Sequence, residues 1–180
     1  MTTKIKNYAE LANRILHKAT DYYNDKLIIK RIFSLDGIDH LETIRLRLTI
    51  IDSYYSTNMN LRYYGIKNIS ELIYYSYKDD TSLKDELIEF VDESYDNYNI
   101  KDIFNKAYGI SKRGEPKGKA ISLISKYAYF LTDFQFPIYD SIVFETYPKI
   151  VNRFPELGIE NKLSSDISHF IRMMRAFNIS

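Results

Sequence analysis

The chain has 180 residues and contains no cysteine. The absence of thiols excludes disulfides, thiolate zinc sites and cysteine nucleophiles. No run approaches the ~18 consecutive apolar residues that a membrane-spanning helix requires. The N-terminal segment MTTKIKNYAE also lacks the apolar region of a secretory signal. We therefore expect a cytoplasmic protein with no membrane partner.

The sequence also lacks a strong excess of charge of one sign. Lysine and arginine total 25 and aspartate and glutamate total 24, which leaves a formal net charge of +1. A surface that is basic all over is thereby excluded, so any contact with nucleic acid has to come from a local patch. Tyrosine, in contrast, is abundant, with 17 copies. Its ring and hydroxyl suit both half-buried helix contacts and stacking on bases.

Common catalytic and metal-binding motifs are missing as well. His17, His40 and His169 are isolated in the sequence, without the one-turn spacing of a zinc motif. No GxSxG motif supports a hydrolase triad. The loop that contains Gly114 and Gly118 is not a P-loop, because only three residues separate these glycines and no hydroxyl residue follows the lysine. We expect neither a metal nor a cofactor.

Hydrophobic residues recur mostly at three- and four-residue steps, which is typical of amphipathic helices. Residues 27–33 are rich in isoleucine and fit either a strand or a helix. Ser70 and Thr81 resemble N-caps of two further helices, and Gly109 closes a short helix over 102–108. The other expected helices end near residue 23, begin at residue 39, cover 119–131 and 141–151, and open at Ser164 or Ser165.

Only one possible strand is present, and a sheet needs partners, so the predicted fold class is all-α. We expect a single compact domain of orthogonal helices over residues 1–180. Two small lobes around a cleft are a possible subdivision, one over 40–108 and the other over 109–180 together with the N-terminal helices. Prolines in the C-terminal half are expected to bound helices rather than interrupt them.

Residues 112–119 form a basic loop that contains glycine. Glycine lets backbone amides approach a phosphate closely, and the N-terminus of the following helix adds partial positive charge. The residues of this loop that we expect to contact nucleic acid are Lys112, Arg113, Lys117 and Gly118, with Lys119 beside them. The alternative is a solvated loop with no ligand.

The stretch after this loop leads through a helix to the sequence Phe136-Pro137-Ile138-Tyr139-Asp140-Ser141. An early helix ending in polar residues (48–57), the segment PKGKA (116–120) and this proline turn with an aspartate occur in the order seen in one family. In this order the chain resembles the helix-hairpin-helix DNA glycosylase superfamily, although the hairpin lacks that family's second glycine. The SKY and FPIYDS stretches also resemble a group of uncharacterised bacterial proteins.

The resemblance implies that Asp140 stabilises the positive charge of an oxocarbenium-like transition state. A lysine with a lowered pKa, Lys119 or Lys126, would attack the sugar and form a Schiff base. Aromatic side chains would stack on the extruded base, and polar ones would read its edge. The stacking candidates are Tyr54, Tyr55, Tyr127 and Tyr139, and the edge-reading candidates are Ser56, Thr57 and Asn58.

Each of these residues also has a purely structural interpretation. Asp140 directly precedes a helix and is a candidate N-cap. Lys126 fits a surface lysine whose stem covers apolar area, and Tyr54 and Tyr55 fit packing residues. Arg172 and Arg175 lie one turn apart near His169, which suits a nucleic-acid backbone, an acidic partner or a solvated flank.

Three functions remain open at this point. The first is a DNA-binding protein that removes or recognises a flipped-out base in the manner of a DNA glycosylase. The second is a nucleic-acid-binding module without catalysis. The third is a helical module that binds another protein through its tyrosine-rich surface and has no role on DNA.

Overall fold

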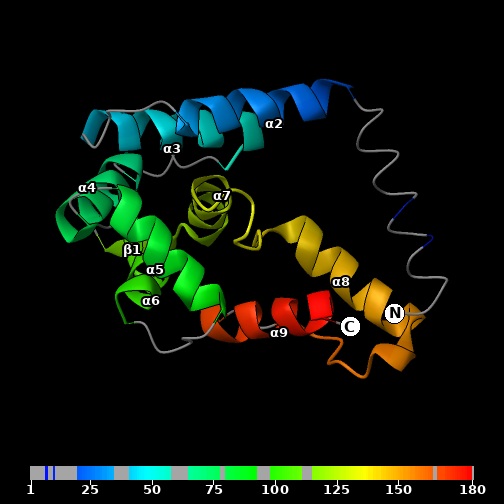
Figure 1. Cartoon of the computed structure of the whole chain (residues 1–180). Coiled ribbons are helices and arrows are strands. Elements are labelled where there is room, and N and C mark those ends of the chain that lie inside the picture. Colours follow the sequence, from blue (N-terminus) through cyan, green and yellow to red (C-terminus); the bar gives the residue numbers. More distant parts are fainter. Residues whose placement is uncertain are drawn as a thin grey trace.

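The computed structural model describes residues 20–34, 41–57, 65–77, 80–92, 98–110, 115–163 and 166–179, together with residues 7 and 10. The described elements are helices, apart from one short two-stranded hairpin (Figure 1). In chain order the elements are α2 (Thr20–Phe33), α3 (Leu41–Tyr55), α4 (Gly65–Tyr77), α5 (Asp80–Asp92), α6 (Tyr98–Asn105), β1 (Ala107–Ile110), β2 (Pro116–Lys119), α7 (Ile121–Leu131), α8 (Ser141–Arg153), the 3-10 helix η1 (Pro155–Leu157) and α9 (Ile167–Ile179).

The fold is all-α, as predicted, but the two strands lie where no strand was expected. Residues 27–33 belong to helix α2, and the segment expected to be helical up to residue 108 leaves the helix after Asn105. From there β1 pairs antiparallel with β2, with Gly109 opposite Lys117. Tertiary contacts explain the change: the Tyr108 ring is buried, and its carbonyl accepts a hydrogen bond from Asn68 of α4 at 2.9 Å.

Helix α7 occupies the middle of the molecule. Nine of its 11 residues are buried, which is typical of a helix that is covered on all sides. It contacts α2, α3, α5 and α6. In Figure 1 it is seen nearly end-on, with α2 and α3 above it and α8 and α9 below. Packing against these helices, which come from well separated parts of the chain, therefore fixes the positions of the α7 side chains.

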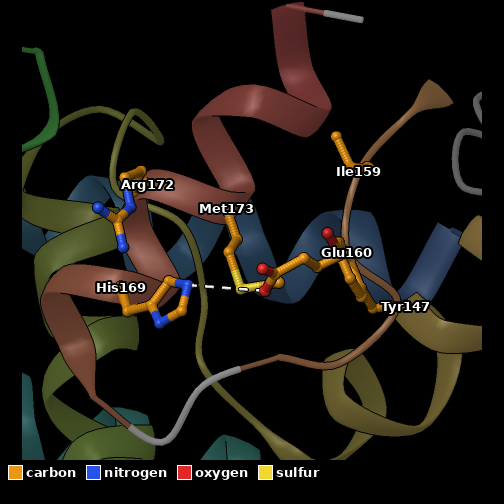
Figure 2. A pocket seen from close by; sticks show the side chains of 6 residues that line it. All are labelled: Tyr147, Ile159, Glu160, His169, Arg172 and Met173. Carbon is orange, nitrogen blue, oxygen red and sulfur yellow. Dashed lines mark ion pairs between the residues drawn. The ribbon is translucent and has the colours of Figure 1, made fainter.

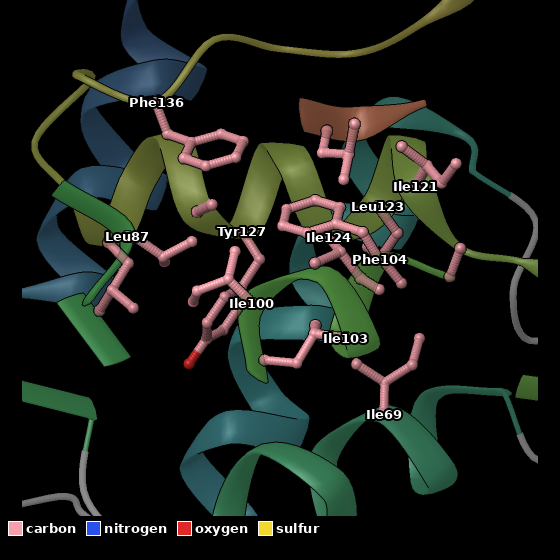
Figure 3. Close-up of a cluster of buried hydrophobic side chains, with 14 of the residues drawn as sticks. Ile69, Leu87, Ile100, Ile103, Phe104, Ile121, Leu123, Ile124, Tyr127 and Phe136 are labelled. Atoms are coloured by element: carbon pink, nitrogen blue, oxygen red, sulfur yellow. The ribbon is translucent and has the colours of Figure 1, made fainter. Parts of the chain in front are cut away.

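The hydrophobic core is one cluster that includes residues from Ile29 in α2 to Met173 in α9. Figure 3 shows the part around α7, where Tyr127 and Ile124 point towards residues of α6. Phe104 of α6 and Phe136 of the loop after α7 stack with ring centroids 5.4 Å apart and an interplanar angle of 3°. This stacking attaches the loop that leads to Asp140 to the core. The proposed division into two lobes stays a prediction.

Two expectations about local signals were wrong. Ser70 is not an N-cap but a buried residue inside α4, where its hydroxyl donates to the Lys67 carbonyl at 2.8 Å. Pro148 lies inside helix α8 instead of bounding a helix, whereas Pro155 begins η1 as expected. The expected cap at Ser164 or Ser165 and most of the first predicted helix lie outside the described residues.

Candidate functional site

Two hydroxyl side chains hold the loop between α7 and α8: that of Ser125 within α7 and that of Thr132 at the C-terminus of α7. Ser125 Oγ accepts a hydrogen bond from the amide of Tyr139 at 2.9 Å. Thr132 Oγ1 accepts one from the amide of Phe136 at 2.9 Å and donates to the Ala128 carbonyl. Both hydroxyl residues are fully buried. These bonds give partners to backbone amides of a loop that no longer makes helical hydrogen bonds, and they fix the position of Asp140.

Asp140 is the N-cap of α8, as its place in the sequence predicted. Its backbone is extended, with φ −150° and ψ 176°, and its Oδ1 accepts a hydrogen bond from the amide of Val143 at 3.0 Å. The second oxygen, Oδ2, lies 3.2 Å from the amine of Lys126. One carboxylate therefore caps α8 and binds a lysine of α7 at the same time.

Lys126 is buried, so its interpretation as a surface lysine was wrong. Only 4% of its side chain is exposed, against 19% for Asp140. Besides Asp140, the amine donates to Ser122 Oγ at 2.8 Å and lies 5.5 Å from the centre of the Tyr55 ring. Burial lowers the pKa of Lys126, and the Asp140 carboxylate partly opposes this shift. The carboxylate is thus the more solvent-accessible half of a mostly desolvated ion pair.

Of the residues predicted for the basic loop, the structure places Lys117, Gly118 and Lys119 on strand β2. Lys119 is the last residue of β2, and its exposed amine donates to Asn105 Oδ1 at 3.0 Å. Asp140 pairs with Lys126 and not with Lys119. Gly118 has the left-handed φ of 84°, which glycine adopts without strain. Lys117 faces Gly109 in the hairpin, and Lys112 and Arg113 lie outside the described residues.

At the end of α3, the ring of Tyr55 lies next to the amine of Lys126. Its ring is half-buried, 6.3 Å from that of Phe130, whereas Tyr54 is exposed. Ser56 follows in a left-handed conformation with φ 48°, and the Thr57 hydroxyl donates to the buried carboxylate of Asp52. Asn58, the third residue predicted to read a base edge, lies outside the described residues.

Of the other two predicted stacking residues, Tyr127 is not available as a platform. It is 1% exposed, and its ring packs edge-on against Phe33 at 5.2 Å in the core. Burial raises the pKa of its hydroxyl, although the nearby Arg47 guanidinium acts in the opposite direction. Tyr139 is half-buried between Phe144 and Phe170, at 4.7 and 4.9 Å, and burial raises its pKa too. Helical spacing alone could not separate these two tyrosines, because only the packing of other helices covers Tyr127.

Sequence reasoning missed two residues that support this site and one buried arginine of the core. Ser122 lies one turn before Lys126 and accepts a hydrogen bond from its amine, a spacing that could have been read from the sequence. Ser125 holds the loop before Asp140. Buried Arg47 of α3 donates to the Phe33 carbonyl at 3.3 Å and stacks on the Phe33 ring. No local signal distinguishes this arginine from half-buried Arg45, the other arginine of the same helix.

Chemically, the pair offers a charged carboxylate whose position is fixed from three sides: by the helix amide, by the lysine and by the loop bonds of Ser125. A fixed carboxylate in a partly desolvated place stabilises a developing positive charge better than one in water. Within the described residues no cluster of three histidine or acidic side chains is placed to hold a metal ion, and no described helix is long and apolar enough to cross a membrane.

The chain matches no protein-family model, no curated protein and no solved structure.

Proposed function

We propose that the protein binds DNA and acts on a nucleotide extruded from the helix, with Asp140 as the carboxylate beside the sugar. The observation that carries this proposal is the Lys126–Asp140 pair, with 3.2 Å between amine and carboxylate at the start of α8. The helix α6, the β1–β2 hairpin and helix α7 follow one another in the chain; α7 carries Lys126, and Asp140 comes after it, directly before α8. This order supports the resemblance to helix-hairpin-helix DNA glycosylases.

In the proposed reaction the glycosidic bond lengthens and positive charge builds on the sugar ring. The Asp140 carboxylate stabilises this charge because the α8 amide and Lys126 hold it in place. The base leaves with the bonding electrons, water adds to the anomeric carbon, and the proton that the water loses passes to the departing base. In this role Lys126 is a positioning residue that acts through Asp140.

A second step, cleavage of the strand, would need a lysine amine that attacks the same carbon and forms a Schiff base. The two candidates differ in complementary ways. Lys126 has a pKa lowered by burial, which favours the nucleophilic neutral amine, but its side chain is covered. Lys119 is exposed on the hairpin, where its amine would have to exchange its hydrogen bond to Asn105 for a substrate. The variants Lys119→Gln and Lys126→Gln, assayed separately, identify which one acts.

DNA would approach the hairpin side of α7. Lys117 and Lys119 lie on β2, directly before the N-terminus of α7, and this arrangement suits a phosphate group. Tyr55, 5.5 Å from the Lys126 amine, and the exposed Tyr54 before it in α3 are the stacking residues that remain available. Binding through a few lysines weakens as salt rises, because each neutralised phosphate releases counterions.

The experiment that tests this proposal uses labelled duplexes that carry uracil, 8-oxoguanine, an alkylated base or an abasic site. We expect base release with at least one of them, and a loss of about 100-fold or more in Asp140→Asn, the order of magnitude expected for losing one preorganised electrostatic group. Asp166→Asn is the matched control, since Asp166 also accepts a helix amide, that of His169, but at the start of α9.

The remaining outcomes decide against the enzyme. Salt-sensitive binding without turnover on all four duplexes would favour the recognition module that lacks catalysis. If neither binding nor turnover occurs, DNA is excluded as the partner and the protein-binding alternative takes its place. Equal activity of Asp140→Asn and Asp166→Asn would show that the carboxylate next to Lys126 has no catalytic role.

A further inference from the structure

A cavity whose lining includes neither Lys126 nor Asp140 lies between α8, the segment after η1 and α9 (Figure 2). Its volume is about 230 Å³. Cavities for drug-sized ligands are generally larger, roughly 300 to 1,000 Å³, so this one suits a fragment-sized molecule. The residues that line it are Tyr147, Ile159, Glu160, His169, Arg172 and Met173.

The inner part of this cavity is apolar. Tyr147 of α8 and Met173 of α9 are buried, and Ile159 is half-buried. The chain reaches Ile159 through Gly158, whose left-handed φ of 63° closes η1, and buried Leu163 then attaches the segment to the core. The segment 158–163 thus forms one wall of the cavity and stays anchored at both ends.

The polar part of the cavity comes mainly from one face of α9. His169 and Arg172 are three residues apart on this helix and therefore lie on the same face. Arg172 is exposed, and among the described residues no ion pair or hydrogen bond occupies its guanidinium. His169 Nε2 lies 3.9 Å from Glu160 Oε2, a long contact, and the Glu160 side chain is 75% exposed. Such an exposed pair is weak and exchanges readily with a ligand.

Glu160 also acts on the hydroxyl of Tyr147. Burial first, and then the Glu160 carboxylate, raise the pKa of Tyr147. The hydroxyl therefore stays protonated at neutral pH and can donate to an anion. The cavity combines an apolar interior with a phenol, an arginine and a histidine that can donate hydrogen bonds to an anion, and one exposed carboxylate, that of Glu160.

We propose that this cavity binds a small molecule that has an apolar body and a single carboxylate. The apolar body packs on Met173, Ile159 and the Tyr147 ring. The carboxylate accepts hydrogen bonds from Arg172, whose planar fork matches a carboxylate, and from His169. Glu160 moves from His169 into solvent. A cationic ligand of the same shape is rejected, because it would face Arg172.

The test compares three probes of nearly equal size and different charge: 3-phenylpropionate, its neutral amide and 3-phenylpropylamine. Their binding is followed through the methyl signal of Met173 in protein labelled with ¹³C-methyl methionine, and Met173→Leu assigns that signal among the 4 methionines of the chain. We expect the acid to shift it and to bind about tenfold more tightly than the amide, the size of one charge-assisted contact. The amine should leave it unchanged.

Arg172→Gln should lower the affinity for the acid to that for the amide without changing the amide itself. The matched control is Arg31→Gln, which removes the same charge from an exposed arginine of α2 on the far side of α7 (Figure 1). If no probe shifts Met173, if acid and amine bind equally, or if the two arginine variants behave alike, the proposal is overturned. The assay contains no DNA, so its outcome is independent of the proposed reaction at Asp140.

Discussion

Lys126 shows how one side chain changes meaning once its surroundings are known. The residue lies in the middle of α7 among apolar residues and serines, and a long flexible stem can bring such an amine to solvent. Here the other helices close over it, and the amine finds Asp140, Ser122 and the Tyr55 ring instead. Taking an ammonium group out of water is costly unless a partner compensates it. The stability of this region therefore depends on which of the two charges is removed.

Removing the carboxylate should be more harmful than removing the amine. Asp140→Asn keeps an N-cap oxygen but leaves the ammonium of Lys126 buried without its counter-charge, and we expect it to lower the free energy of unfolding by about 3 kcal/mol. Lys126→Met fills the same space with apolar atoms, while the more exposed Asp140 keeps the amide of Val143. This variant should stay within about 1 kcal/mol of the native protein.

Urea unfolding of the two single variants and of the double variant measures both effects. The double variant should resemble Lys126→Met alone, because no buried charge is left uncompensated in it. If the two losses simply add, the side chains are not coupled, and the ion pair contributes nothing to the stability of the α7–α8 junction.

At the scale of elements, helix α8 contains an unusual residue for its position. Pro148 is the eighth residue of a helix of 13. A proline there has no amide to donate to the carbonyl one turn earlier, and its ring crowds that carbonyl. The helix persists because Tyr147 and Val151 bury its inner face against the core. Tertiary packing has overridden local preference.

Pro148→Ala should therefore stabilise the protein. The regained hydrogen bond and better helix propensity outweigh the larger entropy of the unfolded chain, which leaves a net gain of about 1 to 2 kcal/mol. Thermal unfolding followed by circular dichroism gives the measurement. Pro155→Ala is the control, since Pro155 occupies the first position of η1, where proline is well suited, and should give no gain. A lower melting temperature for Pro148→Ala would show that packing of the proline ring matters more than the missing bond.

Over the whole molecule, buried tyrosines set the response to alkaline pH. Burial raises the pKa of the hydroxyls of Tyr77, Tyr108 and Tyr127, with nearby acids adding to the shift in the first two. These hydroxyls stay protonated in the folded state and ionise near pH 10 in the unfolded state. The unfolded state then binds fewer protons, so stability is fully present below about pH 10 and falls as pH rises further.

Lys126 acts in the opposite direction, because its folded pKa is lowered and its contribution to stability grows as pH approaches the unfolded value. Because several tyrosines lower the free energy of unfolding at alkaline pH and only one lysine raises it, the net effect is a loss of stability. We expect the urea concentration at the unfolding midpoint to decrease as the pH is raised from about 9.5 to about 11, a range that brackets the pKa of ~10 of tyrosine in the unfolded state. Tyrosinate absorbance should appear together with unfolding. Tyr75→Phe, at a tyrosine that is 73% exposed, should not change this profile. Tyrosinate absorbance that appears fully before unfolding would contradict the assignment.

The sequence by itself determined the fold class and many local features of this protein. Three- and four-residue spacing marks one face of a helix, and a polar residue before such a run marks a cap, so the helical content and Asp140 as the N-cap of α8 were predictable. These signals depend on residues within one or two turns. Any property that depends only on such neighbours can be read from the chain.

Only the tertiary structure decided which faces meet. The strands 107–110 and 116–119 pair because Tyr108 is buried and its carbonyl accepts a hydrogen bond from Asn68, 40 residues earlier. Lys126 is covered because α3 brings Tyr55 across it, and the cavity lined by Met173 exists because the segment after Gly158 crosses between α8 and α9. Burial depends on segments far apart in sequence, and burial in turn sets the cost of a charge, the shift of a pKa and the space for a ligand.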